Sequence, residues 1–189
     1  MFAFKKKYFL IIENINDINL NNIKENNKFI IIYRNSKSTY NLSELLKFRK
    51  KCKVKRIKFF TANNQKLCCL LNSDGIYISA SNKSFKPLHL KRRNMDIIGS
   101  AHNILEIKLK KKQGCNYIIV SKLFKVDYAQ SSKFLEVIRF NYLAKFYKNI
   151  IPLGGIKLTN LNKLKMVKSK GIAIMTGIKK KPAIANRLF

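Results

Sequence analysis

Two glycine-containing segments near the end of the chain could bind an anion. In "IIPLGGI", Gly154 and Gly155 directly follow a short apolar run, and in "GIAIMTGI", Thr176 and Gly177 do the same. Glycine lets backbone N–H groups approach an anion closely, and the start of a following helix adds a favourable dipole. The alternative interpretation is a tight turn between a strand and a helix. The repetition of the pattern at two successive runs favours one composite anion site.

Short apolar, β-branched runs that recur along the chain indicate the elements that must position these loops. Eight runs are predicted as strands: 8–12, 28–34, 56–61, 75–79, 96–100, 116–121, 150–154 and 171–176. Each is almost continuously apolar, which is typical of strands buried on both faces. Helical patterns lie between them at 41–52, 103–114, 134–148 and 158–171. Asn41 or Ser43 could cap the first of these helices, and Asn103 the second.

This alternation predicts parallel βαβ units, and the count of eight predicts a closed (β/α)8 TIM barrel formed as a single domain by residues 1–189. The first and fourth connections, "NINDINLNNIKENN" and "NKSFKPLHLKRRNM", give only minimal or degraded helices. A doubly wound open sheet is the alternative fold. In such barrels the active site lies at the carboxyl ends of the strands, and the loops after strands seven and eight often hold a phosphate. We therefore expect Arg34, Ser100, Ser121, Gly155 and Thr176 to share one rim.

The charge balance is strongly basic, with 40 Lys and Arg residues against 9 Asp and Glu, a formal net charge of +31. Such a field attracts polyanions, so a nucleic-acid-associated protein is an alternative of another class. Against it, the sequence shows no helix-turn-helix, RNA-recognition aromatic pair or zinc-finger pattern. Lys, Asn and Ile, which all have AT-rich codons, are abundant throughout, and the basic residues are dispersed. Nucleotide bias of the genome therefore explains the charge at least as well as a polyanion ligand does.

No run reaches the roughly 18 apolar residues of a membrane-spanning helix. The N-terminal segment "MFAFKKKYFLIIEN" has its apolar start before its lysines, which is the wrong order for a signal peptide. We therefore expect a soluble, cytoplasmic protein without a membrane partner. Its oligomeric state is left open.

The segments "IIPLGGI" and "KGIAIMTGI" resemble the thiamine phosphate synthase and TenI barrels, whose ends read P-V-x-A-x-G-G-I and then D-G-[IV]-A-V-x-S-[AG]-I. Other pieces follow in the family's order. "IIYRNS" (31–36) stands where the family has Q-L-R-[DE]-K, and "NSDGIYIS" (72–79) resembles G-A-D-G-V-H-L-G. "IIGSAHN" (97–103) resembles I-G-x-S-x-H-[SN], and "GCNYIIVSKLF" (114–124) resembles G-A-D-Y-[VI]-x-x-S-P-V-F. The resemblance covers nearly the whole chain.

The resemblance implies an enzyme that joins a hydroxymethylpyrimidine diphosphate to a thiazole phosphate with loss of pyrophosphate. It implies catalytic roles for Arg34, Ser100 and Lys122. It implies substrate contacts at Arg34, Lys37, Ser100, His102, Gly154, Gly155, Thr176 and Gly177. Arg34 matches the arginine that binds the diphosphate, and Ser100 matches a serine that contacts the pyrimidine or its diphosphate. Gly155 and Thr176 match the thiazole phosphate cradle. His102 matches a common histidine, although helix entry or packing is an alternative role for it.

The chain also departs from the family pattern. The family's two magnesium carboxylates fall near Asn63 and Asn82, and neutral amides are poor replacements on a hard dication, so a Mg²⁺ cofactor is doubtful. Ser36 stands at the motif lysine, with Lys37 one step further on. Lys122 stands where the synthases usually have proline and the TenI thiazole tautomerases can carry a catalytic histidine. Lys122 could bind phosphate, act as an acid or base, or be a solvated rim residue.

Three functions follow from this combination. The chain could be a divergent synthase, a TenI-like thiazole tautomerase, or a barrel that binds a phosphorylated ligand without catalysis. All three take small phosphorylated heterocycles as ligands. The synthase is the interpretation that we carry forward.

Overall fold

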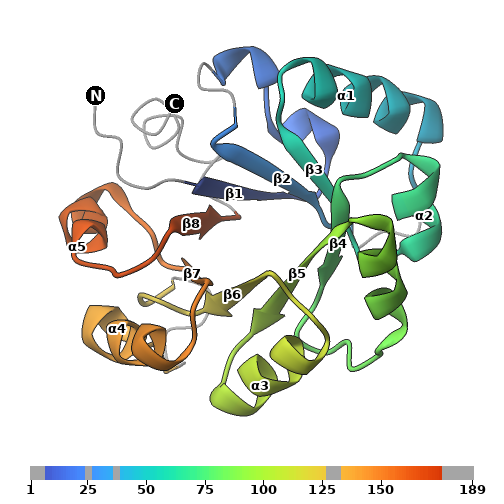
Figure 1. Cartoon of the computed structure of the whole chain (residues 1–189). Helices are drawn as coiled ribbons and strands as arrows, with labels where there is room; N and C mark the ends of the chain where they lie inside the picture. Colours follow the sequence, from blue (N-terminus) through green and yellow to red (C-terminus); the bar gives the residue numbers. More distant parts are fainter. Residues whose placement is uncertain (1–6, 24–26, 36–38, 127–132, 176–189) are drawn as a thin grey trace.

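Eight parallel strands form a closed barrel in the computed structural model, which describes residues 7–23, 27–35, 39–126 and 133–175 (Figure 1). The strands are β1 (Lys7–Ile12), β2 (Phe29–Tyr33), β3 (Lys58–Ala62), β4 (Gly75–Ile78), β5 (Asp96–Ala101), β6 (Tyr117–Ser121), β7 (Ile150–Leu153) and β8 (Gly171–Ile174). Each pairs with the next in chain order, and β8 pairs with β1 to close the barrel. The predicted (β/α)8 barrel is confirmed, and the open sheet is excluded.

The helices lie outside the strands, as Figure 1 shows. They are α1 (Leu42–Val54), α2 (Gln65–Leu70), α3 (Ile104–Lys112), α4 (Glu136–Phe146) and α5 (Leu161–Lys165). Four 3₁₀ segments complete the set: η1 (Ile15–Asp17), η2 (Leu20–Asn22), η3 (Lys86–Arg93) and η4 (Leu158–Asn160). In the described part of the first and fourth connections only 3₁₀ segments occur, as the sequence predicts. No helix in the described ranges is both long and apolar enough to cross a membrane.

Asparagine side chains begin the helices that lead away from the barrel rim. Asn41 caps α1, Asn64 caps α2 and Asn103 caps α3, each by accepting hydrogen bonds from backbone N–H groups of the first turn. The predicted helix over 158–171 is shorter in the structure. Asn160 does not cap α5, because its amide instead binds Gly155 O and Lys157 N.

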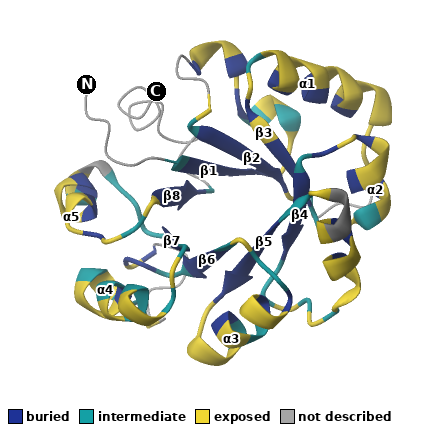
Figure 2. Cartoon of the chain, viewed as in Figure 1, coloured by how far each residue is buried: buried dark blue, intermediate teal, exposed yellow. Residues whose placement is uncertain are grey.

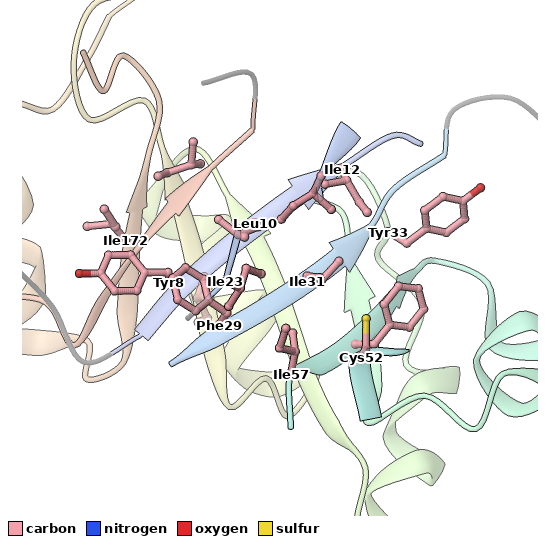
Figure 3. Close-up of a cluster of buried hydrophobic side chains, with 14 of the residues drawn as sticks. Tyr8, Leu10, Ile12, Ile23, Phe29, Ile31, Tyr33, Cys52, Ile57 and Ile172 are labelled. Carbon is pink, nitrogen blue, oxygen red and sulfur yellow. The ribbon is translucent and has the colours of Figure 1, made fainter. Parts of the chain in front are cut away.

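Alternate residues of each strand form two apolar layers, and this explains why the strands are apolar almost throughout. The inner layer fills the barrel with Phe9, Ile11, Ile30, Ile32, Phe60, Tyr77, Ile98, Ile119, Ile151 and Ala173. The outer layer packs under the helices, and Figure 3 shows part of it, including Tyr8, Leu10, Phe29, Ile31 and Ile172. Figure 2 shows the resulting pattern, with buried strands and helices exposed on their outer faces.

The same alternation selects the residues that face the barrel axis at its carboxyl-terminal rim. Counting two residues on from Ile32, Tyr77, Ile98 and Ile119 of the inner layer gives Arg34, Ser79, Ser100 and Ser121. The barrel therefore presents one arginine and three hydroxyl groups above its apolar interior.

Candidate active site

The centre of the rim contains Tyr77, a buried phenol from β4. The side chain of Ser100 on β5 and the charge of Arg34, which follows β2, both act on the pKa of this phenol. Burial raises the pKa of Tyr77, and Ser100 and Arg34 oppose this shift only in part. Arg34 and Ser100, which the resemblance assigns to the pyrimidine diphosphate, thus both act on the pKa of this one phenol.

Sequence reasoning missed Tyr77 because an aromatic residue inside an apolar run is interpreted as core. A signal was present, since the strand resembles G-A-D-G-V-H-L-G and Tyr77 stands at the position of that motif's histidine. Its body belongs to the inner apolar layer, while its hydroxyl reaches Ser100 at the rim. A tyrosine can fulfil both roles because its ring is apolar and its tip is polar.

His102 and Ser121 meet at the next pair of strand ends. Ser121 Oγ lies 2.8 Å from His102 Nδ1, and the backbone N–H of His102 donates to Glu106 Oε2 at 2.7 Å. The carboxylate on α3 therefore fixes the backbone of His102, and the ring is left to bind Ser121. The contact with Glu106 agrees with the helix-entry role considered for His102, and a contact of His102 with substrate stays a prediction.

The glycine loop after β7 packs closely on the loop after β6. Phe124 N–H donates to Gly154 O at 3.1 Å. Gly155 has φ +69°, and a Cβ added there would lie 2.5 Å from the carbonyl oxygens of Phe124 and Lys125. No side chain fits in that space, so the position requires glycine on grounds of both conformation and contact. The Asn160 amide, which donates to Gly155 O at 2.7 Å, holds the loop from the other side.

Lys122 lies beside this loop. A Cβ added at Gly154 would lie 3.4 Å from Lys122 Cα and 3.5 Å from Lys122 Cβ. Gly154 has φ +99°, a left-handed conformation that favours glycine. Lys122 therefore belongs to the same part of the rim as the predicted phosphate cradle.

Asn63 and Asn82, which follow β3 and β4, are also brought together. Asn63 Oδ1 accepts hydrogen bonds from Asn82 Nδ2 at 3.2 Å, Ser79 N at 3.0 Å and Ser79 Oγ at 3.3 Å. Three donors thus point at the oxygen that would have to face a cation. These residues do not fit a magnesium ion, because an amide oxygen surrounded by N–H and O–H groups is no longer available as a ligand.

Four residues named from the sequence fall on 36–38 and 176–189, outside the described residues: Ser36, Lys37, Thr176 and Gly177. Their position relative to the site stays a prediction. The described members of the set, Arg34, Ser100, His102, Lys122, Gly154 and Gly155, all lie at the carboxyl-terminal ends of β2, β5, β6 and β7.

The closed barrel of eight parallel strands with helices outside it is a (β/α)8 barrel, a fold in which the loops after strands seven and eight often bind phosphate. The family model of thiamine monophosphate synthase, TMP-TENI, matches residues 16–178, and the chain belongs to this family. The resemblance noted in the sequence is therefore confirmed.

Curated relatives are thiamine-phosphate synthases of moderate identity. The protein of Clostridioides difficile (strain 630) is 28% identical over 152 residues, covering 78% of this chain and 71% of the relative. The protein of Picrophilus torridus is 27% identical over 167 residues, covering 85% and 81%. The match to one protein of Prochlorococcus marinus, 27% identical over 131 residues, spans 67% of this chain and only 37% of the relative.

Among solved structures, thiamine phosphate pyrophosphorylase from Pyrococcus furiosus superposes with a TM-score of 0.76 at 15% identity, covering 98% of this chain and 95% of that one. Phosphoribosyl anthranilate isomerase from Thermotoga maritima superposes with a TM-score of 0.68 at 8% identity, covering 96% of each chain. At these identities the likeness establishes the shared fold alone.

Proposed function

We propose that the chain is a thiamine phosphate synthase-type transferase. Its substrates are a hydroxymethylpyrimidine diphosphate and a thiazole phosphate. The bond between the pyrimidine methylene carbon and the diphosphate oxygen breaks, and pyrophosphate leaves with the electron pair. The thiazole ring nitrogen then supplies the pair that forms the new C–N bond, which gives thiamine phosphate and pyrophosphate.

The observation that carries this proposal is the fit of Gly155 against the backbone of Phe124 and Lys125. It holds the loop after β7 in one shape, which supports a role for this loop as a preorganised phosphate cradle. Family membership over residues 16–178 supports the assignment of this loop to the thiazole phosphate.

Arg34 and Ser100 would serve the other substrate, at the ends of β2 and β5. Arg34 would stabilise the charge that develops on the leaving diphosphate, and Ser100 would contact the pyrimidine. Ala62, Leu153 and Met175 pack on the inner apolar layer at the same end of the barrel. They would keep water from the electron-poor methylene carbon until the thiazole nitrogen attacks.

Thiazole tautomerisation is a second candidate, favoured by the position of Lys122 beside Gly154. A proton-transferring group for a thiazole phosphate has to lie on the cradle side of the rim, as Lys122 does. In this case the pyrimidine side, including Arg34, would have no part in the reaction.

Two variants separate these functions. For a synthase, Arg34→Ala should lower kcat/KM for thiamine phosphate formation by two to three orders of magnitude, since losing one preorganised donor costs about 2.7–4 kcal/mol. Lys122→Ala should then have the smaller effect. For a tautomerase, Lys122→Ala should abolish turnover and Arg34→Ala should be mild. Arg56→Ala is the matched control, because Arg56 is exposed and precedes β3 at the opposite end of the barrel.

A further inference from the structure

We infer that the rim over β3 and β4 binds the diphosphate group through hydrogen-bond donors and without a divalent metal ion. The inference rests on the proposed function, because it concerns the diphosphate of that reaction. The group involved is an amide–hydroxyl cluster formed by Asn63, Ser79 and Asn82.

The hydrogen bonds within this cluster show which of its side-chain atoms donate and which accept. Ser79 N is a donor by chemistry, and its 3.0 Å contact identifies the Asn63 atom that receives it as the oxygen. Asn63 Nδ2 then donates to Ser79 Oγ at 3.1 Å, and Asn82 Nδ2 donates to Asn63 Oδ1 at 3.2 Å. The oxygen of Asn82 is also occupied, because it accepts from Ser84 N at 2.9 Å. Both amide oxygens are therefore used inside the protein.

The side-chain amide nitrogens of Asn63 and Asn82 can each donate a further hydrogen bond. Each carries two hydrogens, and the contacts given within the described residues use one hydrogen of Asn63 Nδ2 and one of Asn82 Nδ2. Asn63 is exposed and Asn82 is half-buried at the rim, so the remaining N–H groups are accessible to a ligand. A ligand rich in acceptor oxygens, such as a diphosphate, matches this donor surface, whereas a hard dication does not.

A buried ammonium group supports the loop that carries Asn82. The side chain of Lys110 on α3 is fully buried, and its Nζ donates to Asn82 O at 2.6 Å and to Gln113 Oε1 at 2.9 Å. Gln113 Nε2 donates to Asn82 O at 3.1 Å and to Ser84 O at 2.7 Å. Lys110 thus holds the backbone of the Asn82 loop from α3. Burial lowers the pKa of its ammonium group, and Cys115 and Glu106 oppose this shift.

The electrostatic environment agrees with an anion rather than a cation at this position. Within the described ranges, no group of three or more His, Cys, Asp or Glu side chains is arranged to hold a metal ion. Lys110 lies behind the cluster, and Arg34 acts on Tyr77 of the neighbouring strand β4. A dication placed at Asn63 and Asn82 would face the same positive field that attracts a diphosphate.

Calorimetric titration of the full chain with inorganic pyrophosphate, in excess EDTA and again with magnesium, tests the inference. We expect binding in EDTA, with an affinity that magnesium changes by less than about threefold. Asn63→Asp or Asn82→Asp should weaken binding in EDTA by about tenfold or more, because a carboxylate repels the diphosphate. Magnesium should restore part of the affinity of these variants only.

Asn116→Asp is the matched control. Asn116 Oδ1 accepts from Ile97 N at 3.0 Å near the start of β5, and an aspartate keeps that bond while adding one negative charge at the opposite end of the barrel. This variant should bind pyrophosphate like the parent chain. Equal weakening by all three substitutions would mean that net charge alone controls affinity, and would contradict the inference.

Product formation, measured in the same two buffers, separates this inference from the proposed function. Pyrophosphate binding that requires magnesium overturns the inference, and thiamine phosphate formed only with magnesium does so while leaving the synthase assignment intact. Metal-free pyrophosphate binding without any product supports the inference and rejects the synthase. The absence of pyrophosphate binding in both buffers also overturns the inference.

Discussion

His102 Nδ1 and Ser121 Oγ lie 2.8 Å apart, so that one hydrogen bond joins the carboxyl ends of β5 and β6 at the barrel rim. The backbone of His102 is held separately by Glu106. The ring is therefore positioned by two contacts, one on its own backbone and one with the neighbouring strand β6. Ser121 faces the barrel axis by register, so this pair lies between the Arg34–Ser100 side and the glycine loop.

We predict that His102 and Ser121 act as a unit. Ser121→Ala and His102→Gln should each lower kcat/KM by about tenfold, the equivalent of about 1.4 kcal/mol, because each leaves the other without its partner. The kcat/KM of the double variant should be no lower than that of the less active single variant. Steady-state kinetics of the four proteins measures the coupling, and strictly additive losses would show that the two residues act independently.

Gly155→Ala should abolish binding of the thiazole phosphate, because the added Cβ would lie 2.5 Å from two backbone oxygens. Gly114→Ala is the control. Gly114 also has a positive φ, +75°, but it follows α3, and its Cβ would meet the side chains of Leu88 and Lys91. Both variants should lose stability in urea denaturation, and only Gly155→Ala should lose the ligand in calorimetry. If Gly155→Ala retained its affinity, the loop after β7 would not be the binding site of the thiazole phosphate.

Alkaline pH should destabilise the fold through Cys52. Burial raises the pKa of this thiol from 9.0 to about 12, with Arg49 opposing the shift. A raised folded-state pKa means that stability is complete below pH 9.0 and is lost as pH rises towards 12. Between about pH 8 and about pH 10 the parent chain should lose about 1.4 kcal/mol more than Cys52→Ala.

Urea denaturation at the two pH values measures this difference. Cys69→Ala, which removes an exposed thiol from α2, should retain the slope of the parent chain. An identical pH dependence in the parent and Cys52→Ala would contradict the prediction.

The eight strands could be predicted because parallel strands covered on both faces leave a strong pattern, as "FIIIY" in β2 shows. Helices with an asparagine cap and a long polar face, such as α1 and α3, could be predicted as well. α2 was missed because six residues, "QKLCCL", are too few to display a helical period. Helix α5 was predicted too long because the apolar spacing continues to the buried Val167, whereas the helix ends at Lys165, where Asn141 of α4 binds Met166 O and Lys168 N.

For the site, the rim positions follow from strand ends and register, and these are visible in the sequence. Contacts between side chains at the ends of neighbouring strands are not, because they depend on side-chain positions that leave no pattern along the chain. The Tyr77–Ser100 and Asn63–Asn82 contacts each join neighbouring strands, and neither shows a pattern along the chain. The contact with Ser79 N identifies the side-chain oxygen of Asn63, and only this contact shows which side-chain atom of Asn63 is left to donate to a ligand.

Formation of thiamine phosphate tests the central claim most directly. The purified full chain would be incubated with the hydroxymethylpyrimidine diphosphate and the thiazole phosphate, and both products would be followed by mass spectrometry and a pyrophosphate assay. The account predicts thiamine phosphate and pyrophosphate in equal amounts, at a rate that falls by two to three orders of magnitude in Arg34→Ala. The absence of thiamine phosphate while both substrates remain intact, or equal product from the Arg34→Ala variant, would contradict it.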